Sequence, residues 1–315
     1  MKNQTPHLSV GIVMRTKNRA VLLRRAIESV LYQTYEHWHL IIVNDGGTAE
    51  IVDELVNNYS NQAKGRIKVI HNSNSVGMEA ASNIGLNRLN TDLAIIHDDD
   101  DSWASGFLHI MTTTYMLKKK ECPSIGGVVC YVNRVLEHLE GNTIKINKVT
   151  RFNQDNKEGL IPLKLMFHQN QFPPIAFIFE LKKCKEIGMY DECLPVLGDW
   201  DFNLRFMTHS DIWLTAHNLA FYHHRPQSTG DMGNSVIAGA NKHQLYRIYL
   251  ENKWLRNDIQ TGHLGLGTLI YSQNNLEKAE SQNQSSKKIK KIKHVILSKI
   301  LWGKKRQYYK NKLNN

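Results

Sequence analysis

The chain has 315 residues, of which 41% are hydrophobic and 22% are charged. This composition excludes a wholly disordered, collagen-like or coiled-coil protein, and the length suggests about two domains. The net charge of +11 is concentrated, because eleven of the 40 Lys and Arg residues lie in residues 287–315, which contain no Asp or Glu. The rest of the chain is formally neutral, which favours a basic interaction segment over a nucleic-acid-binding fold.

The cysteines and the first residues favour a cytoplasmic protein. Cys122, Cys130, Cys184 and Cys193 show no CxxC spacing, so we expect reduced thiols. Residues 1–10 lack the apolar core of a signal peptide, and no apolar run approaches the roughly 18 residues that span a bilayer. We therefore expect the protein to face the cytoplasm, where it can still contact a membrane surface.

The first hundred residues predict alternating strands and helices. Leu8–Met14 is a near-continuous apolar run, typical of a strand buried on both faces. Further strands are expected at 38–43, 66–70 and 92–97, and helices at 19–34, 48–59 and 77–90. This order implies a parallel sheet with right-handed crossovers.

The pattern loosens after residue 105. Helices are expected at 106–120 and 241–255 and from Asp199 onward, strands at 125–133 and 174–180, one or two strands within 212–223, and a hairpin or loop at 134–160. Residues 272–286 are polar and read as a linker. The predicted organisation is a main domain at 1–255, an extension with the linker at 256–286, and a basic tail at 287–315.

Polar side chains follow three of the predicted strands, at Arg15–Arg19, Asn44–Gly47 and Asp98–Asp101. The carboxyl ends of parallel strands meet at one edge of a sheet, where ligands bind. Four adjacent aspartates repel one another unless a cation or a hydrogen-bond network compensates them. Carboxylate oxygens suit Mg²⁺ or Mn²⁺ bound together with phosphates, so we favour this interpretation over a solvated turn with helix-capping aspartates.

Two later motifs allow both a structural and a functional interpretation. Asp199 either caps a helix or acts as a general base. Trp200 either packs in the core or stacks on a sugar. His223 and His224 either decorate a strand end or belong to the site, and Arg225 can bind phosphate oxygens in a bidentate manner.

Taken together, the motifs resemble those of the GT-A-fold inverting glycosyltransferases of family two, from bacterial surface polysaccharide synthesis. The resemblance covers residues 8–228 and is carried by Thr16 and Asn18 and by the segments IIVNDGGT, GMEAASNIGLNRLNTDLAIIHDDDD and GMYDECLPVLGDWDFNLRF. It implies an α/β fold of the GT-A type, with a Rossmann-like, mixed and mainly parallel sheet flanked by helices.

The resemblance also implies roles for individual residues. Asp199 is the expected general base. The expected nucleotide contacts are Arg15, Thr16, Asn18, Asp45, Asn83 and Asp99. The expected metal ligands are Asp98, Asp100 and His224, with Asp100 the direct ligand, and the expected diphosphate or acceptor contacts are His223, Arg225, Trp200 and Asp201. Asn44, Ser82 and Gly198 depart from the family, which commonly has Asp, Arg and Glu there.

The expected reaction is inverting transfer of a sugar from a nucleotide-diphosphate sugar, a UDP-sugar by family habit, to a hydroxyl of a lipid-linked glycan, with Mn²⁺ or Mg²⁺ as cofactor. One alternative is a nucleotidyltransferase, but RTKNR lacks the glycine-rich phosphate loop expected there. The other alternative is a non-catalytic membrane- or nucleic-acid-binding protein on a degenerate transferase fold. The acidic run together with Asp199 argues against that alternative.

The basic tail predicts an amphipathic helix. Ile289, Ile292, Ile296 and Ile300 fall on one helical stripe, and lysines fill much of the rest. This pattern is typical of a helix lying on anionic lipid, so we expect a peripheral position on the inner face of the plasma membrane and no specific nucleic-acid partner. The alternatives are a solvated tail, an oligomerising helix or nonspecific RNA binding.

Overall fold

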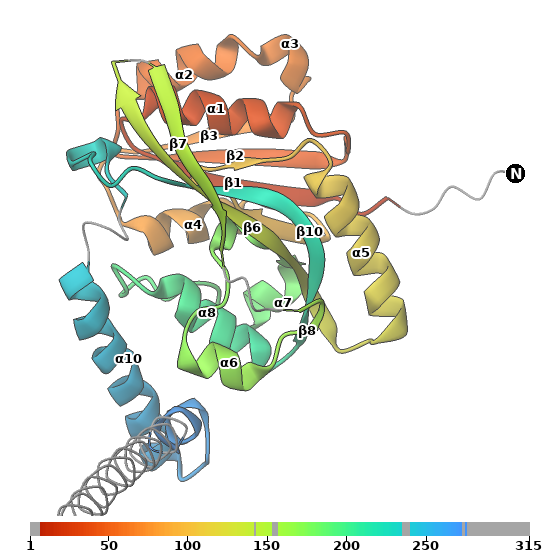
Figure 1. Cartoon of the computed structure of the whole chain (residues 1–315), viewed down its shortest axis with the longest axis vertical. Coiled ribbons are helices and arrows are strands. Elements are labelled where there is room, and N and C mark those ends of the chain that lie inside the picture. Colours follow the sequence, from red (N-terminus) through yellow and green to blue (C-terminus); the bar gives the residue numbers. More distant parts are fainter. Residues whose placement is uncertain (1–6, 142, 153–156, 235–239, 273–274, 276–315) are drawn as a thin grey trace, which may run out of the picture. The chain divides into compact units, whose positions relative to one another are not determined.

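A computed structural model of the chain describes residues 7–141, 143–152, 157–234, 240–272 and 275 (Figure 1). Within this part, ten strands form one sheet in the order β3-β2-β1-β4-β9-β6-β10-β5, with β7 paired to β6 and β8 paired to β10. Helices flank this sheet, as the sequence predicts.

The parallel half of the sheet confirms the predicted alternation. It consists of β1 (Val10–Thr16), β2 (Trp38–Asp45), β3 (Ile67–Asn72) and β4 (Leu93–Ile96), which are all parallel. Figure 1 shows α1 (Ala20–Leu31), α2 (Ala49–Asn57) and α3 (Ser60–Ala63) on one face and α4 (Met78–Asn87) on the other. Because both faces are covered, Val10, Ile12, Val13 and Met14 of β1 are fully buried.

The second half of the sheet is mixed. Here β9 (Phe177–Glu180) runs antiparallel to β4 and to β6 (Ile125–Glu140), while β10 (Asp211–His224) is parallel to β6. The two short strands β5 (Ser102–Trp103) and β8 (Gly159–Leu160) pair antiparallel with β10. The remaining elements are α5 (Phe107–Glu121), α6 (Leu163–His168), η1 (Pro174–Ala176), α7 (Leu181–Glu186), α8 (Gly198–Met207), η2 (Gly230–Met232) and α10 (Ala240–Thr261).

Long-range pairing extends one predicted strand and decides between alternatives that the sequence leaves open in two places. The strand expected at 125–133 continues to Glu140 and turns into β7 (Thr143–Arg151), so residues 134–160 begin as a hairpin. Residues 212–223 form one bent strand with register shifts near Thr215 and Asn218, where local bulges bend it. Pairing between β6 and β10 extends both strands beyond what local composition indicates.

The chain divides into two compact units, Met1–Leu250 and Glu251–Asn315. In the second unit, the Asp258 carboxylate accepts hydrogen bonds from the backbone N–H groups of Gly265 and Thr268 and from the Thr268 hydroxyl. The expected domain boundary after residue 255 stays a prediction. The basic tail and most of the expected linker lie outside the described residues. In the described part, no helix is both long enough and apolar enough to cross a membrane.

Candidate active site

Two adjoining cavities lie at the sheet edge where the carboxyl ends of β1, β2 and β4 meet. The larger cavity has a volume of about 560 Å³ and the smaller one about 320 Å³. Arg15, Met78, Asp98 and Tyr222 line both cavities. The two spaces therefore share a wall, and that wall contains one cation and one acid.

Asp45, at the end of β2, holds a fixed negative charge in the wall of the larger cavity. Its carboxylate accepts hydrogen bonds from Asn72 Nδ2 (2.9 Å), Ser75 Oγ (2.7 Å) and the N–H groups of Val76 (2.9 Å) and Gly77 (3.1 Å). Burial alone would raise the pKa of Asp45, but these donors outweigh it and lower that pKa below 3.8. The carboxylate is thus ionised and oriented before any ligand arrives.

The loops after β1 and β2 brace each other. Asn18 has a left-handed backbone conformation (φ 54°), and its Oδ1 accepts a hydrogen bond from the Thr48 N–H at 3.1 Å. Asn44 closes its own turn, because its amide exchanges hydrogen bonds with the backbone of Gly47. This explains why an asparagine serves at position 44. Thr16 is buried and lines the larger cavity.

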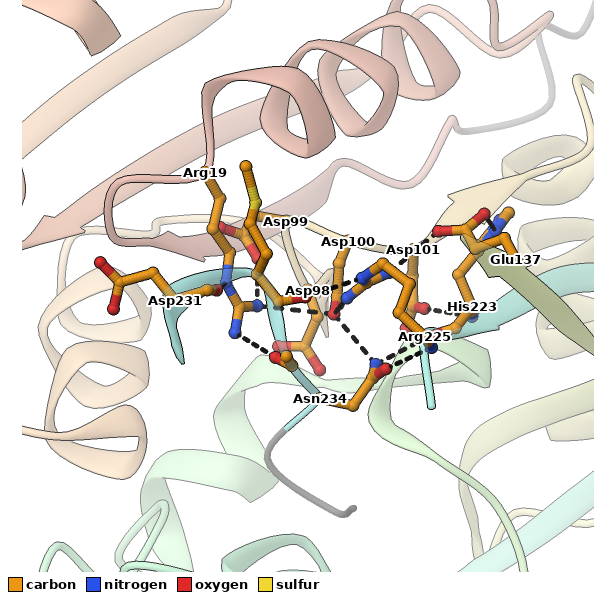
Figure 2. A network of polar contacts seen from close by, with 12 residues as sticks. Arg19, Asp98, Asp99, Asp100, Asp101, Glu137, His223, Arg225, Asp231 and Asn234 are labelled. Carbon is orange, nitrogen blue, oxygen red and sulfur yellow. Dashed lines mark hydrogen bonds and ion pairs between the residues drawn. The ribbon is translucent and has the colours of Figure 1, made fainter. Parts of the chain in front are cut away.

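Arginines from the loop after β1 neutralise the acidic run. Arg15 forms an ion pair with Asp98. Arg19 reaches Asp99 at 3.1 Å and Asp100 at 3.5 Å (Figure 2). Guanidinium groups of the chain itself therefore offset part of the mutual repulsion among the four aspartates that the sequence predicts.

A second group of ion pairs and hydrogen bonds, centred on Glu137, connects to the acidic run through Arg225. Figure 2 shows Arg225 between Asp100 and Glu137, and it forms an ion pair with each of them. Glu137 also accepts from Arg25 (2.7 Å) and from His223 (2.6 Å). Burial raises the pKa of Glu137, but the hydrogen bonds from His223 and Arg25 outweigh it and bring the pKa to about 2. Arg225 itself is fully buried, so it stabilises Asp100 without reaching either cavity.

Asp99 and Asp101 remain incompletely compensated. Burial raises the pKa of Asp99 to about 6, against the lowering effect of Arg19, and raises the pKa of Asp101 well above its usual range. Among the described residues, the Oδ2 atoms of both aspartates are buried without a hydrogen-bond partner. Part of the negative charge of the acidic run is therefore not compensated by the chain, and a further positive charge would stabilise it.

Asp199, the second residue of α8, lies in the wall of the smaller cavity. Its carboxylate accepts hydrogen bonds from Asn170 Nδ2 (2.7 Å) and from the Trp200 N–H (2.8 Å). Burial is the main cause that raises the pKa of Asp199 to about 6. The turn before it places Leu197 in the left-handed region (φ 64°), a strained backbone of the kind found at functional sites.

Six residues expected at the site lie outside both cavity walls in the described part: Asn18, His223 and Arg225, whose contacts are given above, and Asn83, Trp200 and Asp201. The Trp200 indole is buried and donates to the Met166 carbonyl (2.7 Å), and Asp201 pairs with Arg205 (2.7 Å). Asn83 exchanges hydrogen bonds with the backbone of Tyr190, which ties α4 to the segment before α8. These contacts give Asn83, Trp200 and Asp201 structural roles.

His224 and Asp100 line different cavities. His224 lines the smaller cavity together with Asp98, whereas Asp100 lines the larger one. Burial lowers the pKa of His224 to about 4, so the imidazole is neutral near pH 7. In the residues that the structure describes, no three His, Cys, Asp or Glu side chains gather into a metal-binding group.

Several charged residues at this edge were not among the predicted site residues, and Arg19, Glu79 and Glu137 are three of them. Arg19 was visible in the RTKNR loop, where its charge beside a sheet edge was the available indication. Glu79 and Glu137 gave no such indication, because one lies in the first turn of α4 and the other within a region without a clear pattern. Only the folded chain shows that both are buried.

Comparison with known proteins identifies the class. The sequence profile of Glycosyl transferase family 2 matches residues 11–172, just over half of the chain. The chain therefore belongs to glycosyltransferase family 2.

Curated relatives share only part of their length with this chain. An uncharacterised glycosyltransferase of Haemophilus influenzae is 31% identical over 137 residues, which cover 44% of this chain and 51% of that protein. The succinoglycan biosynthesis protein ExoW of Rhizobium meliloti is 35% identical over 89 residues, covering 28% and 27% of the two chains. The chain thus spans about half the length of the first of these relatives and less of the other.

Solved structures share the fold. S. aureus TarS in complex with UDP-GlcNAc superimposes with a TM-score of 0.54 at 14% identity, over 71% of this chain and 60% of that chain. The mannosyltransferase PcManGT of Pyrobaculum calidifontis, in complex with GDP-Man and Mn²⁺, gives a TM-score of 0.51 at 14% identity, over 72% and 59%. At this identity the likeness establishes the GT-A fold.

We predict that Asp45→Asn destabilises the protein in a pH-dependent manner. The variant places an amide against N–H donors and should lose about 1–3 kcal/mol of unfolding free energy at pH 7. The folded pKa of Asp45 is lowered, so the wild-type advantage is present above the unfolded pKa of about 3.9 and is lost as pH falls through the folded pKa. Urea unfolding at pH 7 and pH 3 measures the difference.

The matched control for this prediction is Asp53→Asn, at an exposed acid on α2. It should change the unfolding free energy by no more than about 0.5 kcal/mol. Equal effects of the two substitutions at pH 7 would show that the four donors around Asp45 contribute nothing.

Proposed function

We propose that the protein transfers a sugar from a nucleotide-diphosphate sugar, with UDP as the nucleotide, to a hydroxyl group of a glycan, with inversion at the anomeric carbon. The observation that carries this proposal is the pair of adjoining cavities. One contains Asp45 and the acidic run, the other contains the buried carboxylate of Asp199, and Asp98 lines both. A donor and an acceptor can thus meet at a common wall.

The larger cavity suits the nucleotide. Asp45 places its fixed negative charge in the wall where the base would lie, and Thr16 lies in the same wall. The cations Arg15, Lys17 and Arg19 line this cavity and are available to a diphosphate. A nucleotide complex of the structurally similar TarS supports this assignment, since that protein was solved with UDP-GlcNAc.

The acids of the larger cavity suit a divalent cation as well. Its wall contains three basic side chains and five acids, namely Asp45, Asp98, Asp99, Asp100 and Asp231. A diphosphate would therefore enter a cavity with more acids than bases. The buried Asp99 oxygen without a hydrogen-bond partner points to the same lack of positive charge. Asp98 and Asp100 would hold the ion. Mn²⁺ or Mg²⁺, when bound, neutralises the charge of the leaving diphosphate as a Lewis acid.

Asp199 acts as the general base in this proposal. Its carboxylate accepts the proton of the acceptor hydroxyl while that oxygen attacks the anomeric carbon from the face opposite the diphosphate. The sugar passes through an oxocarbenium-like state, as in glycoside hydrolysis. Asn170 and the Trp200 N–H orient the carboxylate, and Arg15 stands between the acids of the two cavities. One displacement inverts the configuration.

We further propose a lipid-linked glycan acceptor in surface polysaccharide synthesis, reached by a peripheral position on the inner membrane face. Support comes from the relative ExoW, a succinoglycan biosynthesis protein, and from the basic sequence of residues 287–315. A chain ending at Ser286 should bind vesicles of anionic lipid at least about tenfold more weakly, since each cation near such a surface contributes about 1 kcal/mol. Co-sedimentation that is equal for both chains would contradict membrane binding by the tail.

The reaction class is tested by a donor screen. Purified protein with Mn²⁺ or Mg²⁺ is offered UDP-, dTDP- and GDP-sugars, and the nucleoside diphosphate released is measured. We expect one donor to be hydrolysed slowly, and we expect EDTA or Asp100→Ala to abolish this release. Asp53→Ala, at an exposed acid on α2, is the control that should leave it unchanged. Release that persists in EDTA would contradict the metal, and absence of both release and nucleotide binding would contradict the function.

The role of Asp199 predicts a pH profile and a variant. Because the base works when ionised, kcat/KM should rise with pH through about 6, which is the raised pKa of Asp199. Asp199→Asn should lower transfer by about two to four orders of magnitude while UDP binding, measured by calorimetry, stays unchanged. Loss of UDP binding in this variant would assign Asp199 a structural role instead.

A further inference from the structure

The residue before the base is a glycine for lack of space. Gly198 has no left-handed backbone angle, so its conformation does not demand glycine. A Cβ atom at this position would overlap the carboxyl group of Glu79 and would lie 2.6 Å from Glu79 Cγ. A carboxyl group from the first turn of α4 thus occupies the volume that a side chain at the start of α8 would fill.

Glu79 cannot easily move to make room. The side chain is only 6% exposed, and Arg15 Nη1 donates to its Oε2 at 3.2 Å. Displacing it would break this ion pair in a place where little water can replace the lost contact. The glycine and the glutamate are therefore sterically complementary.

The place of Glu79 is electrostatically unfavourable. It lines the smaller cavity together with Asp98 and Asp199. Burial raises the pKa of Glu79 to about 7, and both aspartates raise it further against the lowering effect of Arg15. A buried acid beside two others costs stability, and such costs are found where a group serves a ligand.

We propose that Glu79 is an acceptor-binding residue. Its carboxyl group accepts a hydrogen bond from an acceptor hydroxyl next to the hydroxyl that Asp199 deprotonates. The inference rests on the proposed function and narrows the acceptor to a sugar with two neighbouring hydroxyl groups. It also makes the pairing of Glu79 with Gly198 the feature that sets acceptor choice.

Acceptor kinetics test this role. Transfer from the donor found in the screen is measured to p-nitrophenyl glycosides of glucose, galactose and N-acetylglucosamine. Glu79→Gln should raise the acceptor KM by about tenfold or more, because an amide replaces the accepting carboxyl group, while the Kd for UDP should change by less than about threefold. Glu79 does not line the larger cavity and contacts it only through Arg15, so UDP binding serves as the comparison for the acceptor effect.

Relocating the carboxyl group gives a sharper test. The double variant Glu79→Ala/Gly198→Glu moves the acid from α4 to α8 within the same volume and should restore the acceptor KM to within about threefold of wild type. The matched double variant Glu79→Ala/Gly198→Gln has the same size without the charge and should not restore it.

A thermal unfolding cycle tests the steric premise without any substrate. Gly198→Ala should lower Tm by roughly 5 °C in the wild-type background, as overpacking does, and by much less in Glu79→Ala, where the volume is free. Equal shifts in both backgrounds would overturn the inference. So would transfer by Glu79→Gln with a wild-type acceptor KM. Absence of both donor turnover and nucleotide binding in the wild type would instead overturn the proposed function, while the unfolding cycle would still report on the steric pairing.

Discussion

Charge compensation at the acidic run is the constraint on which the rest of the site depends. Asp98, Asp99 and Asp100 stand side by side at the end of a buried strand, and their repulsion must be offset for the sheet edge to form. The guanidinium groups of Arg15 and Arg19 offset part of this repulsion through ion pairs with the aspartates. Because the compensation is incomplete, the same edge keeps a negative excess, and the proposed binding of a cation together with a diphosphate rests on that excess.

An ion pair and a hydrogen bond also connect the end of β10 and the segment after it to the acidic run. Arg225 lies just beyond β10, and its buried guanidinium joins Asp100 to Glu137 of β6. Asn234 donates to both Asp100 and the His223 carbonyl (Figure 2). The segment that lines the larger cavity is thus attached to the acidic run itself. Fold and binding site share the same ion pairs, so substitutions in this network are expected to affect both.

Local sequence was sufficient for the parallel half of the fold. The apolar runs of β1, β2 and β4 predict buried strands, and their ends place Arg15, Asp45 and Asp98 at one edge, as the structure has them. Parallel topology requires that result once the strands are recognised.

What the sequence could not supply depends on contacts between distant segments. Nothing near Glu137 indicates that it will meet Arg25, Arg225 and His223, and this meeting is what withdraws His223 and Arg225 from the cavity walls. In the same way, Trp200 follows Asp199 in sequence, yet its indole donates to the Met166 carbonyl within the core. Residue type predicted which charges gather at the edge, while packing decided which side chains line the two cavities.

Arg15 has a consequence for the order of events. Its guanidinium contacts Asp98 in the wall shared by both cavities and Glu79 in the smaller one. In the proposed reaction, a phosphate that draws on this charge would weaken its hold on Glu79, so binding in the larger cavity would alter the affinity of the smaller one. Such coupling is reciprocal by thermodynamic linkage. In the proposed reaction, Arg15 would thus couple the binding of the donor to the binding of the acceptor.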